Sequence, residues 1–285
     1  MSLVVLDGII GQGITAELGS VKAFGDCIGQ PVQVYDVMKL GKAILALPDD
    51  VMLFGPENAE LFRKVREIGY EETGKQILLA GSRNAIIRTD ASLLWDGKIS
   101  ENNDADLIQQ YIPALDLIIT MIEASQEITA EFSCAEGKPT NKYSRLFKDQ
   151  CLNERQVLQW QDVEISNSKE WASTISRNHL LNGRNPIKHY TLAVGEPTIN
   201  LFKATTITNV PRAYFTYAMT DASPGLIQFR NALIDKISAY QLVASDPKTV
   251  EIKFSTGSDQ VAVASYCIKR DLYDYTKESD LLIAI

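Results

Sequence analysis

The stretch LVVLDGIIGQGITAELG, residues 3–19, decides how the fold begins: an apolar run, then closely spaced glycines, then a helical pattern. A second β-like run, PVQVYD, follows at residues 31–36, and NAELFRKVREIG at 58–69 again has helical spacing. The first 70 residues therefore predict short strands interleaved with helices.

The glycines of this stretch allow two interpretations. Gly11, Gly13 and Ala16 fit the pattern G-x-G-x-x-A, and Asp36 ends the next strand about 20 residues later, where an acid that binds a ribose hydroxyl would stand. The same glycines also suit an ordinary loop, because the pattern is short and loose. The chain that follows does not continue as a regular alternation of strand and helix, and it offers no obvious catalytic set.

Composition limits the classes of protein that fit. The chain has 285 residues, 45% of them hydrophobic, and a formal net charge of -8, so it can bury a core and does not present a basic surface. We expect no sequence-specific nucleic-acid binding. The longest apolar stretches, such as ALDLIITMI, are shorter than a bilayer span, and the N-terminus lacks the pattern of a signal peptide.

No metal, cofactor or catalytic residue is predicted. The four cysteines are far apart and form no C-x-x-C pair, which predicts reduced thiols and no structural zinc; they are Cys27, Cys134, Cys151 and Cys267. His179 and His189 stand beside no nucleophile motif, so both are expected to be structural. The tryptophans are expected to be core or interface anchors; they are Trp95, Trp160 and Trp171.

A second possible site lies near the C-terminus, in SDPKTVEIKFSTGSDQ. Glu251 and Lys253 form an E-x-K pair that, with an upstream Asp246 or Asp235 and with Gln260, would suit a Mg²⁺-dependent nuclease. Ordinary strand alternation explains the pair equally, since Val250, Ile252 and Phe254 alternate with it.

The middle of the chain predicts extended and helical elements. Residues 76–96 contain two apolar runs separated by AGSRN, which predicts a hairpin or a two-stranded arm. Apolar residues from Leu107 to Ile122 recur at helical spacing, and this predicts a long helix beginning near residue 104 that Pro113 would kink. Residues 261–268 and the closing LLIAI are predicted as strands of a sheet, so the fold class expected is α+β.

The element order resembles the HK97-type fold of tailed-phage major capsid proteins and encapsulin shells. The resemblance is carried by the helix, Gly-containing turn, TLAV strand and short helix between Trp171 and Ala204, followed by the C-terminal strands. It covers residues 165–285 best. It implies an N-terminal arm and peripheral part at 1–75, an extended β loop at 76–103, a spine helix at 104–135, an axial-type domain at 136–245 and closing peripheral strands at 246–285.

The resemblance implies a non-enzymatic subunit that assembles with many copies of itself into an icosahedral-type shell, as a bacteriophage major capsid protein or as an encapsulin-like compartment. Its partners would be further copies and a packaged genome or protein cargo, and its place the virion or the cytoplasm. It also implies that the apolar residues 281–285 are paired in a sheet and buried. The alternative from another class is a Rossmann-type nucleotide-binding enzyme that uses Gly11, Gly13 and Asp36.

Overall fold

The structure is a computed structural model of the whole chain. It describes residues 2–8, 12–49, 51, 53, 58–81, 84–89, 104–122, 154–193, 196–217, 223–247 and 260–285.

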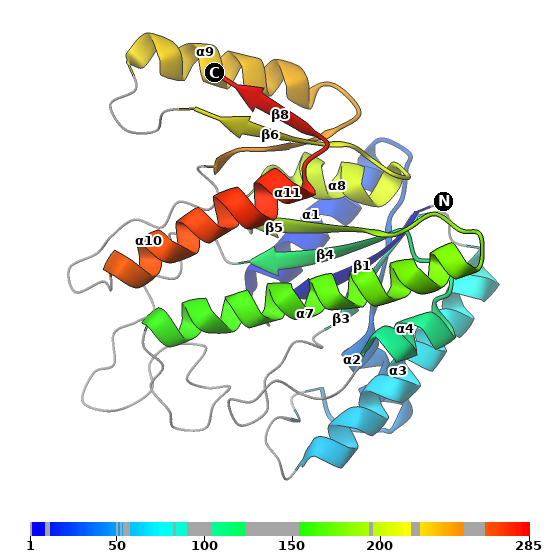
Figure 1. Cartoon of the computed structure of the whole chain (residues 1–285). Helices are drawn as coiled ribbons and strands as arrows, with labels where there is room; N and C mark the ends of the chain where they lie inside the picture. The colour runs from blue at the N-terminus through cyan, green and yellow to red at the C-terminus, as the bar shows by residue number, and fades with distance from the viewer. Residues whose placement is uncertain are drawn as a thin grey trace.

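Five parallel strands form the central sheet (Figure 1), in the order β2-β3-β1-β4-β5. They are β1 (Ser2–Gly8), β2 (Gln33–Asp36), β3 (Asn84–Thr89), β4 (Leu117–Ile122) and β5 (Lys188–Ala193). Every residue of β1 and of β4 is buried. Continuous apolar runs of this kind are typical of parallel strands whose two faces are both covered by helices.

Helices cover both faces of this sheet. On one face α1 (Gln12–Cys27) and α8 (Thr198–Thr206) pack against Val4 and Leu6 of β1. On the other face Leu3 and Val5 contact a larger group of helices; these are α2 (Val37–Ile44), α3 (Ala59–Ala80), α4 (Asp104–Tyr111) and α7 (Glu154–Leu181). The alternation of side chains along β1 thus divides the core into two clusters.

A second, three-stranded parallel sheet has the order β7-β6-β8. Its strands are β6 (Arg212–Thr216), β7 (Val243–Ser245) and β8 (Leu281–Ala284). The helix α9 (Pro224–Ser238) lies on the side of this sheet that is remote from the five-stranded sheet (Figure 1). Before β8 the chain forms α10 (Gln260–Lys269), the π-helix η3 (Arg270–Tyr275) and α11 (Thr276–Glu278).

The predicted mixture of helices and strands is confirmed, and so are several individual elements. The β-like run at 3–7 lies within β1, and the one at 31–36 includes β2. The TLA part of the TLAV run lies in β5. The helix predicted before the NGRNP stop is α7, and Gly183 follows it with a φ of 68° in the left-handed region.

The hairpin predicted at residues 76–96 is wrong over the part that the structure describes. Residues 76–80 end helix α3, and residues 84–89 form β3, which is parallel to both of its neighbours. The run ILLA looked like a strand because it is apolar, yet Leu78 and Leu79 are 82% and 87% exposed on the last helical turn. Residues 90–96 lie outside the described residues.

The spine helix predicted over residues 104–135 is also wrong where it can be compared. Helix α4 ends at Tyr111, just before Pro113, whose ring cannot continue a helix, and residues 117–122 form the buried strand β4. A strand buried on both faces is apolar at every position, so it also matches a helical spacing by coincidence. Residues 123–135 lie outside the described residues.

Two expectations for the C-terminal region change as well. Residues 261–268, predicted as a strand, belong to helix α10. The closing apolar residues do form a strand, β8, which pairs with β6, but Leu281 and Leu282 remain 50% and 58% exposed instead of buried. Among the described helices, none combines the length and the apolar character that crossing a membrane would need.

Candidate functional site at the carboxyl edge of the five-stranded sheet

The order of the strands points to one place on the sheet. From β1 the chain crosses to β2 on one side, and from β3 it crosses to β4 on the other side of β1. In open parallel sheets, ligands bind outside the carboxyl ends of the strands where the connections diverge in this way. The carboxyl end of β1, where the chain leads into α1, is therefore the candidate site.

Gly8, the last residue of β1, is required by close packing at this edge. A Cβ atom at Gly8 would lie 2.8 Å from Cδ1 of Ile14 and 2.9 Å from the carbonyl oxygen of Met121. Only glycine lets the end of β1 lie this close both to the backbone of β4 and to the first turn of α1.

A second glycine pattern, which was not predicted from the sequence, runs from the end of β1 into the first turn of α1. Gly8, Gly13 and Thr15 fit G-x-x-x-x-G-K-[ST], the loop that cradles phosphates between a strand and a helix, except that Ile14 replaces the lysine. Ile14 is 4% exposed and packs in the core with β1 and β4. The signal was hidden because the missing lysine removes the most recognisable residue of the pattern.

A cation reaches the same turn from a different strand. Nη1 of Arg88, near the end of β3, donates a hydrogen bond of 3.1 Å to Oγ1 of Thr15. The guanidinium also lies 3.8 Å from Oδ2 of Asp36. Arginine is suited to this place because its planar donors match the oxygen atoms of a phosphate.

Asp36 does end β2 as predicted, but it is not adjacent to β1. Strand β3 lies between β2 and β1, so two strand spacings, about 10 Å, separate them. In dinucleotide-binding folds the second strand adjoins the first, and its acid can reach the ribose. Here the Asp36 carboxylate caps helix α2, accepting a hydrogen bond of 2.9 Å from the backbone N–H of Lys39. Gly13 lies in α1, and Gly11 lies outside the described residues.

A buried carboxylate lies beneath the site. Asp7 is 0% exposed and accepts hydrogen bonds from the hydroxyls of Thr89, at 3.2 Å, and of Ser168 on α7, at 2.9 Å. Arg66 of α3 is near enough to Asp7 to interact with it: burial lowers the pKa of Arg66, while Tyr70 and Asp7 raise it. Side chains from β1, β3, α3 and α7 thus converge on this point.

The structure describes three of the residues named for the predicted nuclease site and not the other two. Glu251 and Lys253 lie outside the described residues, whereas Asp246 follows β7 and accepts a hydrogen bond of 2.7 Å from the hydroxyl of Tyr217. Asp235 and Gln260 lie on α9 and at the start of α10. Within the described ranges, no group of three or more His, Cys, Asp and Glu side chains is placed to hold a metal ion.

The remaining sequence candidates are divided between the core and the surface. Cys27 is an exposed free thiol and Cys267 is partly buried on α10, while Cys134 and Cys151 lie outside the described residues. Trp171 is buried in the core, as expected. Trp95 and the side chain of Trp160 lie outside the described part of the structure.

His189 has a setting that the sequence did not reveal. Its Nε2 lies 2.9 Å from Oγ1 of Thr120 on β4, and its Nδ1 lies 3.0 Å from Oε1 of Glu278 on α11. This is the order of a nucleophile, a base and an orienting carboxylate. Thr120 is 0% exposed, however, so a substrate could not reach its hydroxyl. We therefore interpret this series of three hydrogen-bonded side chains as structural. The other histidine, His179, is buried near the end of α7, where its Nδ1 lies 3.2 Å from the carbonyl oxygen of Asn185.

Glu278 is the centre of a network that joins the two sheets. Besides His189 it contacts the backbone N–H of Thr191 at 2.7 Å, Arg212 of β6 at 2.6 Å and Lys169 of α7 at 3.2 Å. Burial alone would raise the pKa of Glu278, but His189, Arg212 and Lys169 outweigh it and lower that pKa to about 2. The carboxylate is thus held in its charged form.

Comparison with known proteins adds no family to these observations, since no protein-family model matches the chain and no curated protein matches its sequence.

Proposed function

We propose that the chain binds the phosphate group of a nucleotide at the carboxyl end of β1. One observation carries the proposal: Arg88 of β3 is hydrogen-bonded to Thr15 in the first turn of α1, beside the tightly packed Gly8 and at the divergence of the strand connections. The backbone N–H groups at the start of a helix favour an anion, and the guanidinium adds a formal positive charge to them.

The type of nucleotide follows from the position of β3. Because β3 and not β2 adjoins β1, the acid that would bind the ribose of a dinucleotide is displaced from the site. We therefore favour a nucleoside mono-, di- or triphosphate over NAD. With Ile14 in the position of the lysine, Arg88 supplies the side-chain charge for binding.

Calorimetric titration of the purified chain with ATP, ADP, AMP and NAD tests the proposal. Arg88→Gln should weaken binding about 10- to 100-fold, because charge-assisted hydrogen bonds contribute about 1.5–3 kcal/mol. The affinity of Arg88→Lys should lie between those of the parent and of Arg88→Gln, since lysine keeps the charge and loses the planar geometry. Lys75→Gln, which removes a cation from the exposed face of α3, is the control and should bind as the parent does.

A folded parent protein that shows no binding to any of these nucleotides at millimolar concentration would contradict the proposal. Binding that is unchanged in Arg88→Gln would place the nucleotide elsewhere on the molecule. Tighter binding of NAD than of the mononucleotides would instead support the dinucleotide alternative with Asp36.

The shell-forming subunit remains a separate prediction of the sequence. Two elements that the resemblance implied were an extended β loop over 76–103 and a spine helix over 104–135, and the described residues of these ranges form the end of α3, β3, α4 and β4 instead. We therefore give phosphate binding precedence. Light scattering combined with electron microscopy would reverse that order if it showed hollow particles of megadalton mass.

A further inference from the structure

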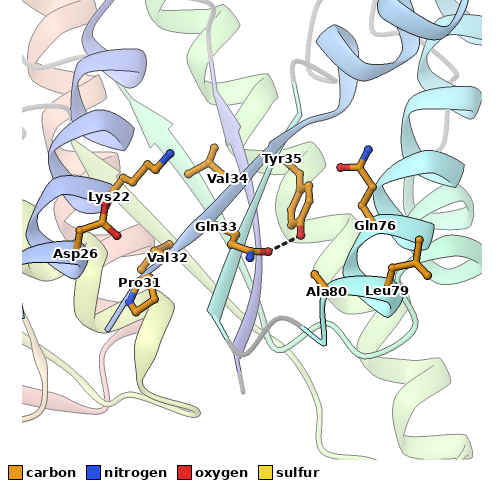
Figure 2. Close-up of a pocket in the computed structure, with 10 residues that line it drawn as sticks. All are labelled: Lys22, Asp26, Pro31, Val32, Gln33, Val34, Tyr35, Gln76, Leu79 and Ala80. Atoms are coloured by element: carbon orange, nitrogen blue, oxygen red, sulfur yellow. Dashed lines mark hydrogen bonds between the residues drawn. The ribbon is translucent and has the colours of Figure 1, made fainter. Parts of the chain in front are cut away.

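The free edge of strand β2 forms the floor of an open groove (Figure 2) of about 630 Å³. Lys22 and Asp26 of α1 stand on one side of β2. Gln76, Leu79 and Ala80, at the end of α3, stand on the other side. The groove therefore lies along the outermost strand of the five-stranded sheet.

The strand itself has backbone groups that a further strand could use. In the described part of the chain β2 pairs with β3 alone, so the alternate N–H and C=O groups of β2 point away from the sheet. Proteins usually protect such an edge with charged side chains, with proline or with a covering segment. Three of the four residues of β2 are uncharged, and the carboxylate of the fourth, Asp36, accepts a hydrogen bond from the backbone N–H of Lys39 at the start of α2. Pro31 lies two residues before the strand, so it removes no N–H donor from β2 itself.

Each side of the groove carries side chains that suit contact with the same side of a second copy related by a two-fold rotation. Lys22 and Asp26 are both exposed and lie one turn apart on α1, with opposite charges. Across β2, Leu78 and Leu79 of α3 are 82% and 87% exposed, which is unusual for large apolar side chains at adjacent positions. An interface between two identical subunits requires a surface that is complementary to itself.

We propose that a second copy of this chain occupies the groove, with the two β2 strands paired antiparallel. The two-fold axis is then perpendicular to the sheet, so that α1 faces α1 on one side and α3 faces α3 on the other. Lys22 of each copy meets Asp26 of the partner subunit, and the exposed leucines of α3 become covered. A partner of single charge sign would satisfy only one of Lys22 and Asp26. The inference is independent of the proposed nucleotide site.

Charge reversal tests this arrangement, with the mass of the particle as readout from size exclusion coupled to light scattering. The parent chain should have twice the 31.6 kDa of one subunit. Lys22→Asp places two acids opposite each other, and Asp26→Lys places two lysines opposite each other, so each variant alone should dissociate at least 10-fold more readily. The double variant, or an equimolar mixture of the two single variants, should restore the dimer because every pair is again of opposite sign.

A second variant addresses the apolar part of the interface. Leu79→Glu adds an acid at a position that is 87% exposed in the single chain, so the fold tolerates it while the dimer should weaken at least 10-fold. Lys236→Asp at an exposed position of α9, which lies beyond the three-stranded sheet and away from β2 (Figure 1), is the matched control, and circular dichroism verifies that each variant is folded.

A parent chain that is monomeric at tens of micromolar would overturn the proposal and leave the groove to a different protein. A dimer that none of the charge reversals affects would equally overturn it, since the contact would then lie elsewhere. Failure of the mixed single variants to associate would exclude the antiparallel geometry.

Discussion

At the scale of single residues, the buried carboxylates Glu278 and Asp7 each lie in contact with several polar or charged side chains. Glu278 is the clearest case, because this buried carboxylate contacts the cations of Lys169 and Arg212 and the imidazole of His189. Asp7 is held in the core by two hydroxyl groups and also interacts with the guanidinium of Arg66. Removing one member of such a buried set leaves its partners without compensation, which costs more than an exposed ion pair contributes.

Glu278 predicts how the stability of the protein depends on pH. Its pKa is about 2 in the folded chain against 4.5 for the unperturbed group, so folding is favoured when the carboxylate is charged. This contribution is complete above about pH 5 and is lost as the pH falls toward 2. At one pKa unit per 1.36 kcal/mol, it amounts to about 3 kcal/mol near neutral pH.

Urea unfolding of the parent and of Glu278→Gln between pH 7 and pH 3 measures this effect. The variant should be less stable at pH 7 by about 3 kcal/mol or more, because the cations around position 278 lose their counter-charge. The difference should shrink as the pH falls. Glu170→Gln, at an exposed carboxylate of α7, is the control and should change little. A constant difference between parent and Glu278→Gln at every pH would contradict the assignment.

At the scale of elements, the contact between α2 and α3 depends on glycine. A Cβ atom at Gly69 would lie 2.1 Å from the carbonyl oxygen of Val37, and one at Gly41 would lie 1.9 Å from that of Val65. Because both conflicts involve backbone atoms, the helices cannot accept a methyl group without moving apart. This close crossing aligns α3 against the sheet, where Tyr70 and Ile77 enter the core.

Gly69→Ala should therefore destabilise the fold although alanine favours helices. We expect a loss of about 1–3 kcal/mol from overpacking, measured as a lower midpoint of urea unfolding. Gly19→Ala is the matched control on α1, since a Cβ atom there would have no heavy atom within 4 Å. It should raise the stability by about 0.5–1 kcal/mol, the usual gain of alanine over glycine within a helix. Equal effects of the two substitutions would show that the α2–α3 contact is looser than described.

Element boundaries were predicted well only where a local signal marks them. Gly183 and the NGRNP stretch mark the end of α7, and the strand signals at β1, β2 and β5 were correct. The predicted type of element was wrong where a run is uniformly apolar, as at 117–122, or where apolar residues lie on an exposed helix end, as at Leu78 and Leu79. In those places periodicity carries no information about the type of element.

At the scale of the whole molecule, two parallel sheets are joined by buried charges as well as by packing. Arg212 of β6 reaches both Glu278 and, at 2.6 Å, the carbonyl oxygen of Thr191 on β5. The candidate nucleotide site lies at the carboxyl edge of the larger sheet, and the proposed dimer contact lies along its β2 edge. Nucleotide binding and dimer formation can therefore be disrupted separately, by Arg88→Gln and by Lys22→Asp.

The sequence by itself determined the mixed content of helices and strands, the helix that follows the first strand and the position of Asp36 at the end of the second strand. These depend on contacts between neighbours along the chain, which local patterns record. Only the tertiary structure decided that β3 separates β2 from β1, that Arg88 instead of Asp36 reaches Thr15, and that His189 joins Thr120 to Glu278. These contacts link residues 69 or more positions apart, and the order in which parallel strands associate leaves no mark on the sequence of any one of them.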